Sequence, residues 1–339
     1  MTLGCVTKQL RGHFNGGCWI PAITVRLMIN LKAIDGTEVS AVCFGCMQFG
    51  GTADGQASRD MYEACRAAGV NFFDTAHTYT GGEAERLLGL FSRQDRERLI
   101  IATKAAYTGG SGRENILRQF DESRARMNQD MIDILYLHRW DSDTPLEETF
   151  ETLSQLQQTG AIRYIGVSNF AAWQVMKAQG IASNLGTSID IIQPMYSLVK
   201  RQAEVELFPM ATCEGINVAP YSPLGSGLLT GKYMNGGVGR LASDTRYAAR
   251  YGQDWMHEVA ATLAQLAGEV NMDPATLAVA WAAHHPAVTA PIISARNVQQ
   301  LVPSLAASTI TLDADAYARI EALSPRPAPA TDRLEEASN

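Results

Sequence analysis

The alternation of short apolar runs with amphipathic stretches constrains the fold of this chain more than any other feature of its sequence. Eight apolar runs follow one another from Ala41 onward, and the stretches between them carry apolar residues at helical spacing. The runs are Ala41–Gly45, Asn71–Asp74, Leu99–Lys104, Ile132–His138, Tyr164–Ser168, Ile189–Gln193, Asn217–Tyr221 and Val288–Ser294. In the stretch Glu83–Phe91, for example, the apolar residues fall on one stripe of a helix. The chain is therefore expected to be built from strand and helix units.

Strands that alternate with helices are joined by right-handed crossovers into a parallel sheet, and eight such units close into a barrel. The sequence therefore predicts an α/β fold, a (β/α)8 TIM barrel. A doubly wound open sheet is the alternative, but no G-x-G-x-x-G motif follows the first apolar run. The length of 339 residues also suits one barrel of this kind.

Two segments add to the simple repeat. Leu31–Val39 precedes the first run and has Asp35-Gly36 at its centre, which predicts an N-terminal β-hairpin that closes the bottom of the barrel. A long gap between the seventh and eighth runs holds a glycine-rich loop, Gly225–Gly239, of the length that is usually functional. Two predicted helices follow this loop, Met256–Leu266 and Thr276–His284. We therefore expect extra helices in the C-terminal part of the barrel.

The two ends of the chain lack the repeating pattern. Residues 1–27 contain four glycines and three Lys or Arg residues without periodic apolar spacing, so a poorly ordered N-terminal extension is expected. A secretory signal is the alternative, although no clear small-residue cleavage site is present. Residues 324–339 are rich in Pro and Ala and are expected to form a flexible tail. The barrel is then expected to span residues 28–323.

Charge and cysteine content narrow the compartment and the class of partner. The net charge of −7 disfavours nucleic acid or an anionic membrane as the partner. Six cysteines are too few for a disulfide framework, which favours a reducing, cytoplasmic location. Cys43 and Cys46 form a C-x-x-C, but residues three apart on a strand face opposite sides and no second C-x-x-C follows. We expect two unrelated barrel residues and no metal site.

Polar residues at the ends of the predicted strands are the candidates for chemistry, because barrel enzymes place their active sites at the C-terminal strand ends. Asp74, Lys104 and His138 end the second, third and fourth runs, and Tyr79 lies five residues beyond Asp74. Their positions on neighbouring strands predict that all four side chains face one mouth of the barrel.

The chemistry of these four groups is consistent with carbonyl reduction. Hydride delivered to a carbonyl carbon leaves an oxygen that needs a proton, and the Tyr79 hydroxyl could supply it. A neighbouring Lys104 ammonium is expected to lower the phenol pKa, and Asp74 would keep that lysine charged. His138 could orient the carbonyl oxygen by a hydrogen bond.

At this point the sequence resembles the aldo-keto reductase family, from about Val39 to about Leu323. Asp74-Thr75-Ala76-His77-Thr78-Tyr79, followed by Gly82 and Glu85, is similar to the family's D-x-A-x-x-Y signature. Further motifs in the family's order are Thr103-Lys104, Leu137-His138, Gly166-Val167-Ser168-Asn169-Phe170, Gln193 with Tyr196, Tyr221-Ser222-Pro223-Leu224, Gly231-Lys232-Tyr233 and Pro291-Ile292-Ile293-Ser294-Ala295-Arg296.

The resemblance implies the roles of the site residues. Asp74, Tyr79, Lys104 and His138 would form the catalytic tetrad of an NADP-dependent aldo/keto reductase that reduces an aldehyde or ketone. The implied cofactor-binding residues for NADPH/NADP+ are Asp74, Ser168, Asn169, Gln193, Tyr221, Ser222, Leu224, Ser226, Lys232, Ser294, Arg296 and Gln300. Short amides and hydroxyls suit a nicotinamide carboxamide, and an aromatic face suits its ring.

Some positions depart from the family pattern. Thr80 stands where the family has a small glycine, and Ala84 where it has a serine before Glu85. Ser294 and Ser304 replace a common Gly and Asn, and Pro303 is expected to kink the last helix or end it early. These departures bear mainly on the adenine end of the cofactor. Arg296 is retained, and its guanidinium suits the 2′-phosphate of NADPH.

Two other functions remain open on the sequence alone. Lys104 could be the lysine of a Schiff-base aldolase, although an aspartate beside it would keep the amine protonated. The barrel could also be a regulatory or redox-sensing subunit that binds the cofactor. The pocket is expected to involve Trp140 and the Gly225–Gly239 loop, with a small-molecule carbonyl compound as substrate. Neither the particular carbonyl compound nor the oligomeric state follows from the sequence.

Overall fold

The computed structural model describes residues 30–336, except 238, 240 and 242–243. In this part of the chain eight parallel strands form one sheet. They are β1 (Cys43–Gly45), β2 (Phe72–Asp74), β3 (Ile100–Ala105), β4 (Ile132–Leu137), β5 (Ile162–Ser168), β6 (Ile191–Gln193), β7 (Asn217–Val218) and β8 (Ile292–Ile293). Each strand overlaps the corresponding predicted apolar run.

The sheet closes on itself. Its order is β7-β6-β5-β4-β3-β2-β1-β8, and the two outer strands are joined by a parallel bridge between Tyr221 and Ile292. The Ile292 amide donates to the Pro220 carbonyl at 2.8 Å, directly across this seam. The predicted (β/α)8 barrel is therefore confirmed, and the open-sheet alternative is wrong.

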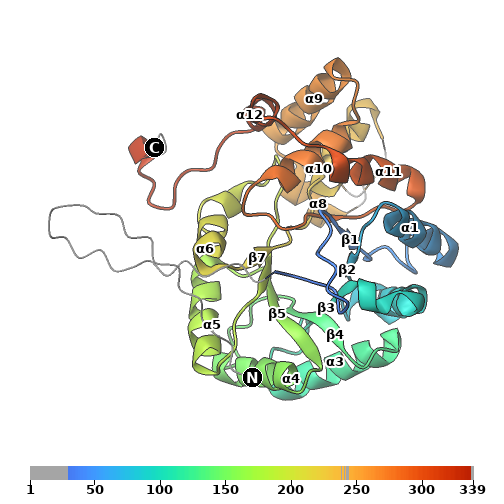
Figure 1. The fold of residues 1–339 in the computed structure, drawn as a ribbon. Helices are drawn as coiled ribbons and strands as arrows, with labels where there is room; N and C mark the ends of the chain where they lie inside the picture. Colours follow the sequence, from blue (N-terminus) through green and yellow to red (C-terminus); the bar gives the residue numbers. More distant parts are fainter. Residues whose placement is uncertain (1–29, 238, 240, 242–243, 337–339) are drawn as a thin grey trace, which may run out of the picture.

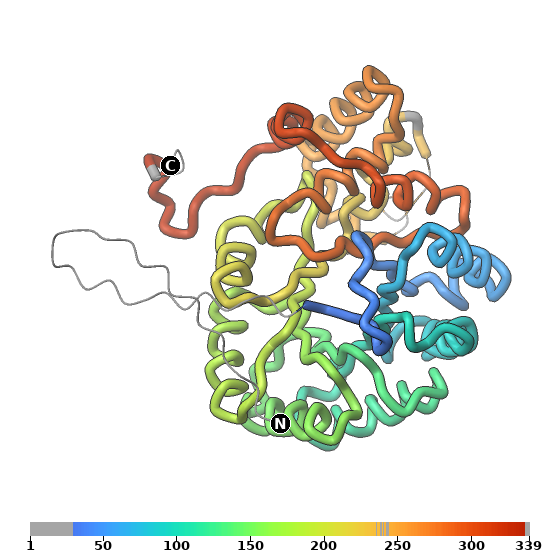
Figure 2. Tube along the Cα trace, viewed as in Figure 1, coloured from blue at the N-terminus to red at the C-terminus, as the bar shows by residue number. Residues whose placement is uncertain are grey.

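Helices surround the strands, as Figure 1 shows. The first six are α1 (Gly55–Ala67), α2 (Glu83–Phe91), α3 (Arg113–Met127), α4 (Leu146–Gln158), α5 (Ala172–Asn184) and α6 (Leu207–Glu214). The later ones are α8 (Thr245–Tyr251), α9 (Asp254–Glu269), α10 (Pro274–His284), α11 (Val298–Ala306) and α12 (Ala314–Glu321). Figures 1 and 2 show α11 beside α1, where the last and first helices of the barrel meet.

Alternation along the strands separates an inner from an outer apolar cluster. On β1 and β2, Cys43 and Phe72 pack inside the barrel, whereas Phe44 and Phe73 pack against the helices. Cys46 belongs to the outer cluster, so the two cysteines of the C-x-x-C face different layers. Burial raises the pKa of both thiols well above the usual range, which keeps them neutral. The expectation of two unrelated barrel residues is confirmed.

The predicted hairpin is present and closes the inner cluster. Lys32 and Glu38 form an antiparallel bridge, and the Ala33 amide donates to the Thr37 carbonyl at 2.8 Å. Leu31 and Ala33 are buried among the inner barrel residues. The hairpin therefore caps the end of the barrel opposite to the carboxyl ends of the strands.

The segment between β7 and β8 contains both predicted helices, as α9 and α10, and one that the sequence did not predict, α8. The extra C-terminal helix is α12, whose Tyr317 ring stacks on Trp281 of α10 at 6.1 Å. Pro303 does not end α11, which continues to Ala306. Leu301, Ser304 and Leu305 of this helix are buried, so packing outweighs the one backbone hydrogen bond that a proline removes.

The predicted domain limits stay predictions. Residues 1–27 lie outside the described residues, as does the end of the predicted C-terminal tail. Within the part of the chain that the structure describes, none of the helices is long and apolar enough to cross a membrane.

Candidate active site

Strained backbone gathers where the loops leave the carboxyl ends of the strands. Five non-glycine residues there have positive φ: Thr80, Ala106, Asn169, Ser222 and Ser226. Such conformations cost free energy and persist only where the surroundings hold them, which is typical of functional sites. At Thr80 the hydroxyl donates to the Phe49 carbonyl and accepts the Ala84 amide, both at 2.9 Å. These bonds explain how a threonine occupies a left-handed position there.

Asp74, Lys104 and Tyr79 form a buried cluster at the ends of β2 and β3. The Lys104 ammonium donates to Oδ2 of Asp74 at 2.5 Å and to the Thr75 carbonyl at 2.8 Å. It also donates to the Tyr79 hydroxyl at 3.3 Å. The lysine is 1% exposed and the aspartate 3%, so little solvent screens their charges. The predicted meeting of these three groups therefore holds in the structure.

The protonation of this cluster differs in one respect from the prediction. Burial lowers the pKa of Lys104, but the neighbouring Asp74 and Tyr79 raise it more, so the ammonium stays charged. Burial also raises the pKa of Tyr79, and the opposing effect of Lys104 does not overcome it. Lys104 does lower the phenol pKa, as expected, but burial raises it more, so the pKa of Tyr79 lies above its usual value.

His138 directly follows β4 and lies beside Tyr79. The two rings meet edge to face, with centroids 5.8 Å apart and planes at 82°. Burial, together with the charges of Lys104 and Arg139, lowers the pKa of His138 to about 3. The imidazole is therefore neutral at physiological pH. Its Nδ1 is buried and has no hydrogen-bond partner among the described residues.

Four of the predicted cofactor residues form one hydrogen-bonded chain beside this cluster. Gln193 donates from Nε2 to Oδ1 of Asp74 at 2.9 Å, and Ser168 donates to the Gln193 carbonyl at 3.0 Å. The Asn169 amide donates to Ser168 Oγ at 3.1 Å, and the Tyr221 hydroxyl donates to Asn169 Oδ1 at 2.8 Å. The ends of β2, β5 and β6 and the Tyr221 segment after β7 are thus linked across the mouth.

The remaining cofactor candidates lie on two loops. The segment after β7 carries Ser222, Leu224, Ser226 and Lys232. The Lys232 ammonium packs closely on the backbone of Gly227, since an added Cβ there would lie only 2.7 Å from it. Ser294, Arg296 and Gln300 follow β8 and lead into α11.

The region after β8 is more open than the cluster. Ser294 and Gln300 are exposed and Arg296 is partly exposed. Asn297 caps α11 by accepting the Gln300 amide at 2.9 Å. The Arg296 guanidinium makes no hydrogen bond or ion pair with any described residue, so it is available for an anion at the start of this helix.

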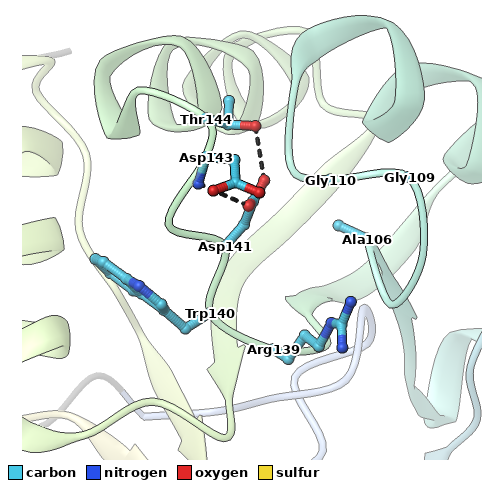
Figure 3. A pocket seen from close by; sticks show the side chains of 8 residues that line it. All are labelled: Ala106, Gly109, Gly110, Arg139, Trp140, Asp141, Asp143 and Thr144. Atoms are coloured by element: carbon cyan, nitrogen blue, oxygen red, sulfur yellow. Dashed lines mark hydrogen bonds between the residues drawn. The ribbon is translucent and has the colours of Figure 1, made fainter.

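A pocket opens beside His138, between the loops after β3 and β4 (Figure 3). Its lining is Ala106, Gly109, Gly110, Arg139, Trp140, Asp141, Asp143 and Thr144. Trp140 was predicted to line the substrate pocket and does line this one, whereas residues of the Gly225–Gly239 loop do not. Asp141 accepts from Thr144 Oγ1 at 2.6 Å and from the Ser111 amide at 2.7 Å, which fixes the turn that forms one wall.

Several residues near the site were not predicted from the sequence. The Tyr107 ring lies 4.8 Å from the His138 ring, and the Arg139 guanidinium lies 5.1 Å from the Tyr107 ring. Tyr247 of α8 is close enough to Tyr79 to raise the pKa of its phenol slightly. Aromatic residues directly after predicted strands could have drawn attention to Tyr107, but nothing in the sequence places α8 over the mouth.

Comparison with known proteins gives a consistent result. The model of the Aldo/keto reductase family matches residues 41–325. A probable voltage-gated potassium channel subunit beta of Arabidopsis thaliana is 33% identical over 293 residues, which cover 80% of this chain and 88% of that protein. An uncharacterised oxidoreductase of Bacillus subtilis is 32% identical over 314 residues, covering 86% and 94%. A norsolorinic acid reductase of Aspergillus flavus is 30% identical over 321 residues, covering 87% and 80%.

Proposed function

The chain is an oxidoreductase of the aldo/keto reductase family, and from this premise we propose that it reduces an aldehyde or ketone to an alcohol with NADPH. The observation that carries the proposal is the buried contact between the Tyr79 hydroxyl and the Lys104 ammonium, at 3.3 Å. Around this contact lie a carboxylate that holds the lysine and a neutral imidazole, which together suit proton delivery to a carbonyl oxygen.

Tyr79 is the proposed proton donor. A phenol whose pKa is raised by burial is fully protonated at neutral pH, which is the form that can donate. As the proton leaves, the Lys104 ammonium stabilises the developing phenolate, and Asp74 holds that ammonium at 2.5 Å. The neutral His138 beside Tyr79 then orients the substrate carbonyl through a ring N–H.

NADPH would supply the hydride when bound. The residues that would hold its nicotinamide are Ser168, Asn169, Gln193 and Tyr221, which already face the same mouth through their mutual hydrogen bonds. The preference for NADPH over NADH is supported by the Arg296 guanidinium, which has no protein partner in the described residues and suits the 2′-phosphate. Lys232 would contribute a second cation from the loop after β7.

The two alternative functions are less well supported. An aldolase needs a neutral amine as nucleophile, whereas the ammonium of Lys104 is held charged by the Asp74 carboxylate. A regulatory subunit is favoured by one finding, that the Arabidopsis thaliana relative is named as a probable channel subunit. Such a subunit could bind the cofactor without turning it over, so measured turnover separates it from the proposed enzyme.

The test is the oxidation of NADPH in the presence of a panel of aldehydes, ketones and dicarbonyl compounds. Tyr79→Phe removes only a hydroxyl, so folding and NADPH binding should be kept while kcat falls by roughly 10²–10⁴-fold. With the phenol pKa raised, turnover by the unmodified protein should stay constant through neutral pH and fall only in the alkaline range.

Tyr164→Phe is the matched control, because its hydroxyl accepts the Lys32 amide in the hairpin at the opposite end of the barrel. Its turnover should equal that of the unmodified protein. Normal turnover by Tyr79→Phe on every active substrate would reject the assignment of the proton donor. NADPH binding without any turnover would favour the regulatory alternative.

A further inference from the structure

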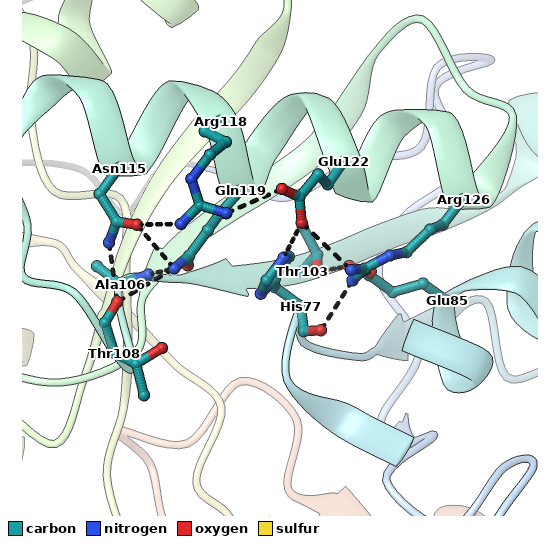
Figure 4. A network of polar contacts seen from close by, with 10 residues as sticks. All are labelled: His77, Glu85, Thr103, Ala106, Thr108, Asn115, Arg118, Gln119, Glu122 and Arg126. Atoms are coloured by element: carbon teal, nitrogen blue, oxygen red, sulfur yellow. Dashed lines mark hydrogen bonds and ion pairs between the residues drawn. The ribbon is translucent and has the colours of Figure 1, made fainter. Parts of the chain in front are cut away.

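A polar cluster outside the barrel joins the segment that carries Tyr79 to the strand that carries Lys104 (Figure 4). Its centre is an ion pair between Glu85 of α2 and Arg126 of α3, in which Nη1 donates to Oε2 at 2.9 Å. The Glu85 side chain is fully buried, at 0% exposure. Burying a carboxylate is costly unless its charge is paired and both oxygens are bonded, and here Arg126 and Thr103 meet both conditions.

The arginine holds the segment of Tyr79 at both ends. Its Nη1 also donates to the His77 carbonyl at 2.9 Å. At the other end, an added Cβ on Gly82 would lie 2.6 Å from Arg126 Nε, so the guanidinium packs directly on the backbone there. Gly82 has a φ of +93°, and it caps the start of α2. Tyr79 lies between these two points of attachment.

The glutamate extends the same cluster to β3. Its Oε1 accepts a hydrogen bond from Thr103 Oγ1 at 2.7 Å, and this threonine directly precedes Lys104. The His77 amide donates to the Lys104 carbonyl at 3.1 Å. The His77 residue is therefore held by Lys104 on one side and by Arg126 on the other.

Close packing of α2 on α3 makes the ion pair possible. An added Cβ at Gly89 would lie 2.2 Å from the Met127 carbonyl oxygen, so only glycine lets the two helices approach this closely. Glu122 completes the cluster, since its Oε2 contacts His77 Nε2 at 2.7 Å and accepts from Arg126 Nη2 at 3.3 Å. The cluster thus has contacts in the Tyr79 loop, in β3 and in both helices.

We propose that Glu85 and Arg126 are positioning residues, which set the separation between the Tyr79 hydroxyl and the Lys104 ammonium. The inference rests on the proposed role of Tyr79 as proton donor. The contact between these two groups, at 3.3 Å, is already at the long end of hydrogen bonding, so a small outward shift of the loop breaks it. Neither positioning residue touches substrate or cofactor.

The first experiment is a cycle of Arg126→Met with Tyr79→Phe. Arg126→Met alone should lower kcat by about 10- to 100-fold and leave KM unchanged, because a displacement of roughly 1 Å at a reacting group has an effect of this size. In the Tyr79→Phe background the same substitution should have no further effect, since the group that it positions is absent. If Arg126 had a purely structural role, Arg126→Met would lower kcat by the same factor in the unmodified protein and in Tyr79→Phe.

Two more variants make the cycle specific. Arg124→Met removes another α3 arginine that pairs with Asp121 at 2.6 Å, away from the Tyr79 segment, and should keep normal kcat. Glu85→Gln keeps the shape of the side chain and its bond to Thr103 while it removes the charge. It replaces Arg126→Met in the cycle if that variant does not fold, with the same expected pattern.

A second measurement does not depend on turnover. In spectra of protein labelled at the tyrosine ¹³Cζ, the Tyr79 resonance is identified by its loss in Tyr79→Phe. Arg126→Met should shift or broaden this resonance, and Arg124→Met should leave it unchanged. An unchanged Tyr79 resonance in Arg126→Met overturns the positioning role, as does a kcat equal to that of Arg124→Met. Absence of carbonyl reduction in the unmodified protein would instead reject the proposed function, and the spectra would still decide the positioning role.

Discussion

The two sides of the barrel mouth are organised differently. On the side of β2 and β3, Asp74 and Lys104 are buried and bonded to each other, to Tyr79 and to Gln193. On the side of β8, the side chains that start α11 are exposed or partly exposed, and the Arg296 guanidinium has no partner among the described residues. On the first side the hydrogen bonds are already made within the protein, whereas on the second the Arg296 guanidinium is left for solvent or a ligand to bond.

This difference follows from what each side is proposed to do. A proton donor and its lysine must already be in place when charge develops, because reorganisation at that moment would add to the barrier. A phosphate site gains affinity from unpaired cations and free helix N–H groups, which water can solvate until the ligand arrives. Substitutions on the first side should therefore change turnover and stability, and substitutions on the second should change affinity alone.

The largest effect is expected from Lys104→Met. Turnover should fall by roughly 10²–10⁴-fold, because Tyr79 loses the charge that stabilises its phenolate. Stability should also fall by about 3–5 kcal/mol, since the buried Asp74 carboxylate loses its ion pair. Steady-state kinetics and urea unfolding measure the two effects.

The double variant Lys104→Met with Asp74→Asn sharpens this result. It removes the unpaired charge, so most of the lost stability should return while turnover stays low. Recovery of turnover together with stability would mean that the lysine has only a structural role.

A smaller effect is expected on the other side of the mouth. Arg296→Ala should weaken NADPH binding by about 10- to 100-fold, the loss of a charge-assisted contact of roughly 1.5–3 kcal/mol. NADH affinity, kcat and melting temperature should not change, because no described residue depends on this guanidinium. Fluorescence titration with both cofactors measures the preference.

Arg93→Ala, which removes an exposed arginine just after α2, is the control for a general loss of positive charge. Equal losses of NADPH and NADH affinity in Arg296→Ala would contradict the assignment to the 2′-phosphate.

The smallest effect concerns the stability of the first side in acid. The pKa of His138 is lowered from about 6.5 to about 3 in the fold, so its neutral form is favoured by folding. This contribution is fully present above pH 6.5 and is lost as the pH falls toward 3. When the pH is lowered from 7 to 4, the melting temperature of His138→Gln should therefore fall less than that of the unmodified protein, and the difference should be roughly 2 °C or more. If the melting temperatures of the two proteins fell equally with pH across this range, His138 would not be buried as described.

Much of the fold could be predicted because the barrel repeats one local pattern. The run that ends at Lys104 is apolar on both faces, as expected for a strand covered by helices outside and packed inside. The alternation of side chains along a strand likewise predicted, from the sequence alone, that Cys43 and Cys46 face different sides of the sheet. The unpredicted α8 and the continuation of α11 past Pro303 depend on packing against segments distant in sequence.

The candidate site was predictable to the same extent. Asp74, Lys104 and His138 end neighbouring strands, so their meeting follows from strand order alone. The role of Arg126 could not be predicted, because an arginine on the polar side of a helix is normally solvated. Only the approach of α2, through Gly89, turns it toward a buried carboxylate.

The sequence by itself determined the strand and helix order, and with it which polar side chains end the strands at the mouth. Tertiary structure decided the distances between them and the direction in which the pKa of Tyr79 moves. The physical reason is that desolvation depends on every atom packed around a group, and around Tyr79 those atoms come from β3, β4 and α8, far away along the chain.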